Sequence, residues 1–147
     1  IGVRVPYCFV EGIKNKKEYQ QLFTDLGFKF VSTHRSSKFG GMNNIKNSLE
    51  PYLLENRLLE IPINGSFDTM FFDKGLEIDA IVNVFLSELR FCQMTGKDYI
   101  PCFHPWCIYS IDPDLLILKA LIKYCVNNGI KIISAKQYYE LRGEING

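Results

Sequence analysis

The chain has 147 residues, 47% of them hydrophobic and 14% aromatic, which suits one folded domain with its own core and excludes a disordered chain. Its 17 basic and 16 acidic residues give a net charge of +1 without a basic cluster, so nucleic acid is not expected as a partner. No apolar run approaches the ~20 residues that a membrane-spanning helix needs, and no membrane span is expected.

Strand and helix patterns alternate in the first part of the chain. The predicted elements are a strand at 1–7, a helix at 16–26, a strand at 28–32 and a polar loop at 33–44. Pro6 is expected to end the first strand, and Gly27 is expected to stop the helix. The predicted buried stripe of that helix, at helical spacing, is Tyr19, Leu22, Phe23 and Leu26.

The same alternation continues to the end of the chain. The predicted elements are a strand at 58–63, a helix at 78–94, a strand at 99–104, a helix from Asp112 to Asn128, a strand at 130–134 and a helix at 136–141. Asp112 is a candidate cap with Pro113 in the first helical turn. The predicted apolar face of the helix at 78–94 is Ile78, Ile81, Val82, Phe85, Leu89 and Cys92.

This order of elements predicts an α/β domain with about five strands and flanking helices. Five strands are fewer than the roughly eight that usually close a barrel. The strand at 1–7 would then present an unpaired apolar edge, which proteins normally cover. We therefore expect a missing N-terminal segment or a partner chain to complete the sheet.

Two short motifs lie where predicted strands give way to loops. Residues 4–7 read Arg-Val-Pro-Tyr, and residues 103–106 read Phe-His-Pro-Trp. In β/α folds, catalytic residues gather at the carboxyl ends of the strands. Arg4 and His104 are therefore expected to meet in one pocket, although a single Arg or His without its motif is more often structural.

The five cysteines are odd in number and scattered, which is typical of buried thiols rather than of a disulfide framework. They are Cys8, Cys92, Cys102, Cys107 and Cys125. This pattern leans toward a reducing, cytoplasmic compartment, although it does not decide the localisation. Cys102, His104 and Cys107 also invite a zinc interpretation, but they supply three of the four ligands usual for structural zinc.

The two motifs and their surroundings resemble the C-terminal portion of the polysaccharide deacetylase family, carbohydrate esterases with a NodB-type domain. Residues 4–7, followed by a helix and Leu-Gly-Phe at 26–28, are similar to the family's third motif. Residues 103–106 resemble the fifth motif in its His-Pro-Trp form, and 129–133 resemble the closing strand. The resemblance implies the C-terminal portion of a distorted (β/α) barrel.

The family resemblance also implies an activity, which is metal-dependent removal of an acetyl group from an N-acetylated sugar. The metal-binding and base motifs of the family, with their Asp and His residues, are not found in this sequence. By family order they would precede residue 1. A divalent metal, zinc or similar, is therefore expected in the complete domain only, and this chain alone is expected to bind none and to be inactive. The expected partner is a glycan or N-acetylated sugar substrate.

The resemblance assigns roles to individual residues. Arg4 would hold the Asp base, the backbone N–H of Tyr7 would stabilise the oxyanion, and His104 would act as general acid. Pro6 and Trp106 would border the substrate pocket, with Trp106 stacking on a sugar face.

Two places depart from the family pattern. Cys107 stands where many members with the His-Pro-Trp form have Glu, and Cys8 stands where Gly or Ser is frequent. The fourth motif, which helps to hold the catalytic His, has no clear counterpart, and the nearest segment by composition is 68–73, from Asp68 to Asp73.

Two alternatives remain beside the deacetylase hypothesis. The chain could be a non-catalytic α/β module that binds a glycan or docks on a partner chain. Within the hydrolases, it could act on a small non-sugar amide, because the candidate residues handle the carbonyl and the leaving amine rather than the sugar.

Overall fold

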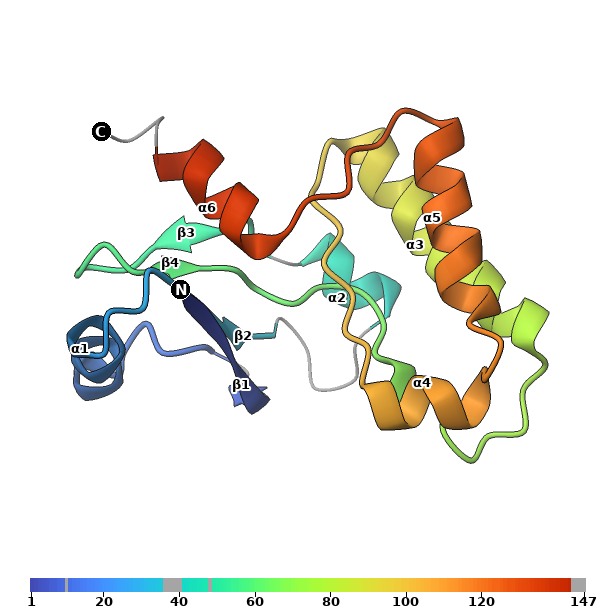
Figure 1. Cartoon of the computed structure of the whole chain (residues 1–147), viewed down its shortest axis with the longest axis horizontal. Coiled ribbons are helices and arrows are strands. Elements are labelled where there is room, and N and C mark those ends of the chain that lie inside the picture. Colours follow the sequence, from blue (N-terminus) through green and yellow to red (C-terminus); the bar gives the residue numbers. More distant parts are fainter. Residues whose placement is uncertain (10, 36–40, 48, 144–147) are drawn as a thin grey trace. The chain divides into compact units, whose positions relative to one another are not determined.

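A computed structural model describes residues 1–9, 11–35, 41–47 and 49–143 and shows a mixed α/β protein (Figure 1). The α/β class predicted from the sequence is confirmed, whereas the barrel stays a prediction. Contacts divide the chain into two compact units, which are described separately. The first unit comprises 1–38, 48–63 and 133–147, and the second comprises 39–47 and 64–132.

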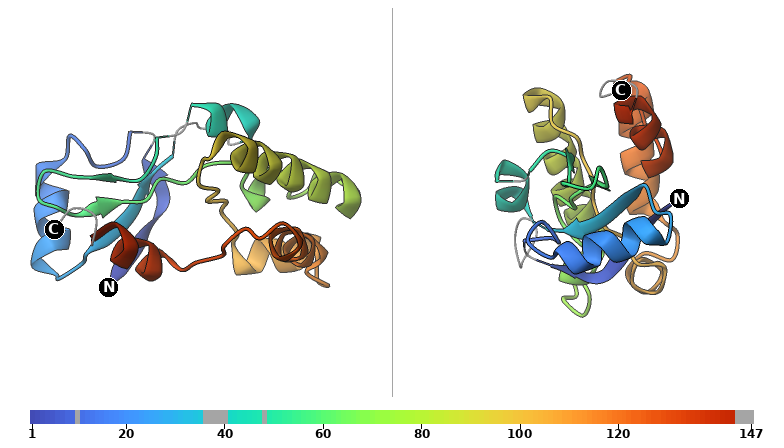
Figure 2. Two further views of the ribbon diagram at one scale, coloured as in Figure 1. Left: turned by 90° about the horizontal axis from the view of Figure 1, so that it is seen from above. Right: turned by 90° about the vertical axis from the view of Figure 1, so that its left-hand side faces the viewer.

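The first unit is built on a four-stranded sheet in the order β1-β2-β4-β3. The strands are β1 (Gly2–Phe9), β2 (Phe30–His34), β3 (Tyr52–Leu53) and β4 (Leu59–Glu60). β1, β2 and β4 are parallel, and β3 runs antiparallel to β4. β1 and β2 lie alongside each other in both views of Figure 2. The three parallel strands match predicted strands, whereas the two-residue β3 was not predicted.

The prediction that Pro6 ends the first strand is wrong, because β1 continues to Phe9. β1 is the edge strand of the sheet, where part of the backbone has no partner strand and a proline is tolerated. The register against β2 shifts between Arg4 and Phe9, and Cys8 within this stretch has a φ of 39°. The irregular stretch therefore continues the strand beyond the proline.

Helix α1 (Lys17–Asp25) is present, but its predicted buried stripe is largely wrong. Tyr19, Leu22 and Leu26 are exposed, and Phe23 alone of the four packs against the core. The buried residue of α1 is Gln20, whose side-chain amide donates to the carbonyls of Ile13 and Lys14 at 2.8 Å each. A polar anchor for the preceding loop thus takes the place of an apolar stripe. The core of this unit contains Ile13, Val31, Leu54 and Leu58.

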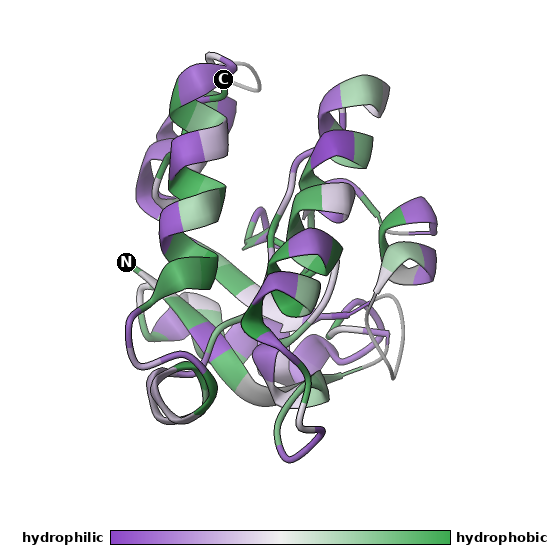
Figure 3. Ribbon diagram, turned by 90° about the vertical axis from the view of Figure 1, so that its right-hand side faces the viewer, coloured by the Kyte–Doolittle hydropathy of each residue, from purple (hydrophilic) through white to green (hydrophobic). Residues whose placement is uncertain are grey.

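The second unit is helical, and its longest helices, α3 (Ile78–Thr95) and α5 (Leu116–Asn127), lie side by side (Figure 1). Both carry mixed hydrophobic and hydrophilic residues along their length (Figure 3). The predicted apolar face of α3 is confirmed, since Ile81, Phe85, Leu89 and Cys92 are buried. Four of the five cysteines are also buried, as predicted. The remaining helices are α2 (Met42–Lys46), a 3-10 turn (Asp68–Met70), α4 (Pro105–Ile111) and, in the first unit, α6 (Ala135–Gly143).

A predicted loop and the start of a predicted helix differ from the structure. The predicted loop at 33–44 contains the end of β2 and the start of α2, and its residues 36–40 lie outside the described residues. The helix expected from Asp112 begins at Leu116 instead. Asp112 nevertheless acts near its start, because its carboxylate accepts the backbone N–H of Ile117 at 2.7 Å.

The strands predicted at 99–104 and 130–134 are wrong. The segment 99–104 makes a single bridge, between Phe67 and Cys102, because side chains replace part of the backbone pairing. Residues 130–134 form no ladder with any strand of the described chain, and Ile132 and Ile133 are exposed. None of the described helices is long and apolar enough to cross a membrane.

Candidate functional site

The candidate site of the second unit is built where segment 99–104 runs beside residues 64–68. Asn64 donates its backbone N–H to the carbonyl of Ile100 at 3.0 Å, and its side-chain oxygen accepts the N–H of Ile100 at 2.7 Å. Asp68 donates its backbone N–H to the carbonyl of Cys102 at 3.2 Å. The Asp68 carboxylate in turn accepts the backbone N–H of His104 at 2.5 Å. Alternating backbone and side-chain acceptors thus hold the two segments in register.

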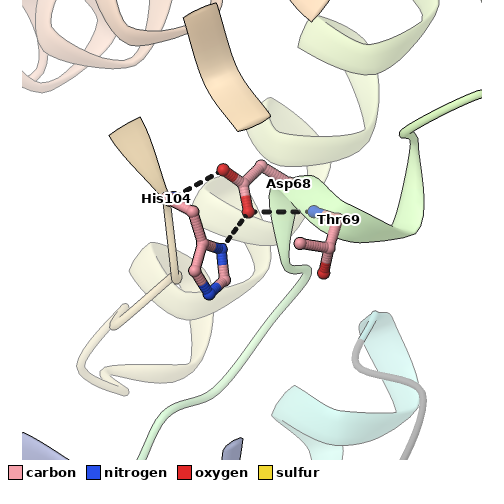
Figure 4. Close-up of polar contacts among 3 residues, drawn as sticks. All are labelled: Asp68, Thr69 and His104. Atoms are coloured by element: carbon pink, nitrogen blue, oxygen red, sulfur yellow. Dashed lines mark hydrogen bonds and ion pairs between the residues drawn. The ribbon is translucent and has the colours of Figure 1, made fainter. Parts of the chain in front are cut away.

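Asp68 also holds the imidazole ring of His104 (Figure 4). Its Oδ1 lies 2.6 Å from Nδ1 of the ring, and the same oxygen accepts the backbone N–H of Thr69 at 2.9 Å. Asp68 is 0% exposed, whereas the side chain of His104 is 41% exposed. Because a carboxylate accepts hydrogen bonds, this contact places the ring proton on Nδ1. Nε2 is then the nitrogen left for another partner.

The backbone around His104 explains why its ring turns toward Asp68. His104 is the N-cap residue of α4, with the extended conformation φ −110°, ψ 124°, and Pro105 occupies the first helical turn. Proline is favoured there because its φ suits a helix and its missing N–H would have no helical partner. The His104 side chain makes no capping hydrogen bond to α4, so it is available to Asp68.

Exposed aromatic rings border His104. Trp106 is 57% exposed, and the centroid of its ring lies 6.0 Å from that of the His104 ring. Phe72 packs edge-on against Trp106 at 5.4 Å and is 36% exposed. These rings offer apolar surface that the ring of a ligand can cover, next to a nitrogen that can exchange protons.

Cys107 of α4 is fully buried, and its thiol hydrogen-bonds with Asp68. Burial raises the pKa of the Cys107 thiol to about 11, with further contributions from the charge and hydrogen bonding of Asp68 and from Asp73. The thiol is therefore protonated near neutral pH. The described residues contain no group of three or more His, Cys, Asp or Glu side chains that could hold a metal ion, so Cys102, His104 and Cys107 do not form the zinc site considered above.

The other predicted site residues lie in the first unit. Arg4 is an exposed residue of β1, paired in register with Ser32 of β2. Pro6 and Tyr7 also belong to β1, and their side chains lie outside the described residues. Arg4 and His104 belong to different units, so their shared pocket stays a prediction.

Sequence reasoning missed a buried carboxylate in the first unit, Glu60. It is 0% exposed, and Oε1 accepts the backbone N–H groups of Thr33 at 2.7 Å and His34 at 3.0 Å. Oε2 accepts the Thr33 hydroxyl at 2.6 Å. Burial raises the pKa of the Glu60 carboxyl, and these hydrogen bonds and the charge of Arg4 oppose that shift only in part. An acid within the apolar run at 58–63 was the available signal.

Comparisons with known proteins return no matching family model, no matching curated protein and no matching solved structure. The resemblance to polysaccharide deacetylases therefore rests on the motifs quoted above. The structure pairs His104 with Asp68, which begins the segment 68–73 named above as nearest by composition to the fourth motif, and so gives a partner to the histidine that the sequence singled out.

Proposed function

We propose that this chain is the C-terminal part of a metal-dependent hydrolase that removes an acetyl group from an N-acetylated polysaccharide or cleaves a related amide. The observation that carries the proposal is the pair formed by buried Asp68 and half-exposed His104. A buried carboxylate on one ring nitrogen, with the other nitrogen available, is the arrangement of a histidine that transfers protons.

The proposed step is protonation of the leaving amine by Nε2 of His104. Amide cleavage expels a strongly basic nitrogen, so a proton donor at the leaving group lowers the barrier. Asp68 fixes the orientation of the ring through Nδ1, and the ring donates from Nε2 as the imidazolium, the form in which both nitrogens carry a proton. Neither role needs a large movement, because both oxygens of Asp68 already contact His104.

The remaining machinery of the proposed hydrolase is assigned outside this sequence. The described residues do not fit a metal site, so the metal ligands and the Asp base would come from a preceding segment or a partner chain. In the complete protein the metal would polarise the amide carbonyl. Arg4 would hold the Asp base, and the backbone N–H of Tyr7 would stabilise the oxyanion.

The proposed substrate contact is the exposed aromatic pair beside His104. Trp106 would cover the apolar face of a sugar ring, and Phe72 supports the Trp106 ring from its edge. Rings that position the sugar without joining the chemistry should act on KM rather than on kcat.

The test measures acetate release from an N-acetylated glucosamine oligomer by the complete protein with its upstream segment. His104→Gln should lower kcat about 10²-fold to 10⁴-fold and leave the metal content unchanged. His34→Gln is the matched control, because the His34 ring is buried against Tyr52 in the first unit and should keep full activity. Loss of bound metal in His104→Gln would overturn the general-acid role.

A second pair of variants tests the aromatic contact. Trp106→Ala should raise KM several-fold, and Tyr109→Ala serves as the control, since Tyr109 is a 68% exposed aromatic residue of the same helix. Equal KM values for the two variants would remove Trp106 from the substrate site.

The exposed pair Trp106 and Phe72 also favours a second candidate, a non-catalytic module that binds a glycan. The upstream sequence separates the candidates, because the hydrolase requires an Asp pair and a pair of metal-binding histidines there. Metal analysis of the complete protein gives the same distinction. A metal-free protein that binds the oligomer without releasing acetate would establish the binding module.

A further inference from the structure

A cavity of about 480 Å³ lies in the first unit. It is bordered by the end of α1, the turn between β3 and β4, and α6. Its volume falls within the range of small-molecule sites, ~300–1,000 Å³. None of the residues proposed for the hydrolase lines this cavity.

Three cationic side chains from distant parts of the sequence line this cavity, namely Lys29, Arg57 and Arg142. None of the described residues that line it is acidic. Like charges collected around a concave surface raise the local concentration of anions. The sequence has no basic cluster at these positions, so the fold alone creates this concentration of charge.

Arg57 stands at a backbone position that favours glycine. Its φ is 64°, in the left-handed region, within a tight turn where the N–H groups of Leu54 and Arg57 donate to Leu58 and Leu54 at 2.9 Å each. Hairpin turns normally place Gly or Asn at such a position. The turn thus holds an arginine at the border of the cavity against its backbone preference.

Apolar and aromatic side chains form the rest of the wall, including Phe28, Leu59 and Tyr139. Tyr139 is held in place by its contact with Phe30 at 6.1 Å between ring centroids. A wall of this kind suits the body of an organic molecule, whereas the three cations suit an anionic group.

We propose that this cavity binds a small organic anion, a ring-sized molecule that carries a phosphate or a carboxylate. Arg57 contacts the anionic oxygens together with the terminal N–H groups of Arg142, whose Nε donates to the Tyr138 hydroxyl at 3.0 Å, and Lys29 adds a point charge. The ring of the ligand packs against Tyr139 and Phe28. This site is independent of the proposed hydrolase and would remain if that function were disproved.

The test is calorimetric titration of the chain with glucose 6-phosphate, glucuronate and glucose. The phosphate or the carboxylate sugar should bind, glucose should not, and added salt should weaken the binding. Binding by one anion alone supports the site and identifies the group it selects. Failure of both anions to bind at millimolar concentration would overturn the proposal.

Arg57→Gly gives the sharpest variant, because it should act on binding and on stability in opposite directions. Glycine relieves the left-handed backbone, so the thermal midpoint should stay or rise while affinity falls about tenfold or more. Lys29→Gln provides a second variant that leaves the turn unchanged and should also weaken binding. The matched control is Lys136→Gln, which removes a cation of α6 outside the cavity that pairs with Glu140. Equal affinities for Arg57→Gly, Lys29→Gln and the wild type would place the anion elsewhere and overturn the site.

Discussion

The two histidines of the chain share one backbone arrangement and differ in what their rings meet. The backbone N–H of His34 donates to the buried Glu60 carboxylate at 3.0 Å, and that of His104 donates to the buried Asp68 carboxylate at 2.5 Å. The His34 ring is buried and contacts the hydroxyl of Tyr52 at 3.2 Å. The His104 ring is half-exposed and contacts the carboxylate itself.

The difference lies in how each carboxylate uses its second oxygen. The second oxygen of Glu60 accepts the Thr33 hydroxyl, so the whole carboxylate serves to hold the end of β2. The carboxylate of Asp68 reaches the ring of a residue open to solvent. A buried acid that binds only buried donors is structural, whereas one that holds an exposed titratable ring can serve chemistry. The His34 site is thus an internal standard for the His104 site.

The largest expected effect is a loss of stability when Glu60, the structural carboxylate of the two, is replaced. Glu60→Ala leaves three donors of Thr33 and His34 without their acceptor in a fully buried place, and should reduce the free energy of unfolding by about 3 kcal/mol or more. Glu60→Gln keeps the size and one acceptor oxygen, so its loss should be smaller. Urea unfolding measures both variants. A loss below about 1 kcal/mol for Glu60→Ala would show that this carboxylate does not stabilise the sheet.

The next effect concerns Asp68. Asp68→Ala should reduce the free energy of unfolding by about 2 kcal/mol, less than Glu60→Ala, because Thr69 is exposed and His104 is half-exposed, so water can replace the lost acceptor. The same change should release the His104 ring from its single tautomer, which the ¹⁵N shifts of Nδ1 and Nε2 report. The His34 signals should not move and provide the control. An unchanged His104 tautomer would show that Asp68 does not orient the ring.

A smaller effect tests how closely the chain packs on His34. Gly12 has a φ of 62°, and a Cβ there would lie 3.0 Å from the Cβ of His34. Gly27 has a φ of 79° with nothing within 4 Å of such a Cβ, so Gly27→Ala carries the backbone effect alone. Gly12→Ala should therefore lose about 1 kcal/mol more than Gly27→Ala in urea unfolding. Equal losses would mean that the residues around His34 shift enough to accommodate the added methyl group.

The sequence predicts an element well where one signal dominates. The apolar periodicity of α3 predicts its boundaries and its buried face, and three of the predicted strands match β1, β2 and β4. The alternation of apolar and polar residues fails to predict a strand where side-chain oxygens compete with backbone carbonyls for the backbone N–H groups. At 99–104 the oxygens of Asn64 and Asp68 take the places of backbone acceptors, so an alternating apolar segment forms no strand.

The candidate site was predictable in part for the same reason. His104 and Trp106 stand in a recognisable motif, and the structure adds their exposure and their partners. Asp68 lies 36 residues away from His104, so composition could only suggest the segment that contains it. The anion cavity could not be predicted, because Lys29, Arg57 and Arg142 come together only through the sheet and α6.

The smallest expected effect is the contribution of the His34 ring to the pH dependence of the unfolding free energy. Burial lowers the pKa of His34 below 6.5, and the charge of Glu11 opposes that shift. As pH falls below 6.5, the unfolded chain binds a proton at His34 while the folded chain does not, so this residue removes stability toward acid. The slope from one such group cannot exceed about 1.4 kcal/mol per pH unit.

His34→Gln should therefore flatten the decline of the unfolding free energy as pH falls below 6.5, relative to the wild type. The raised pKa of Glu60 acts in the opposite sense, because the folded chain takes up its proton before the unfolded chain as pH falls. Glu60 is present in both proteins, so subtracting the two pH profiles isolates His34. Glu11→Gln removes the opposing charge and should steepen the decline. If His34→Gln and wild type decline in parallel, the His34 ring is not held neutral by burial, and the contrast with His104 loses its physical basis.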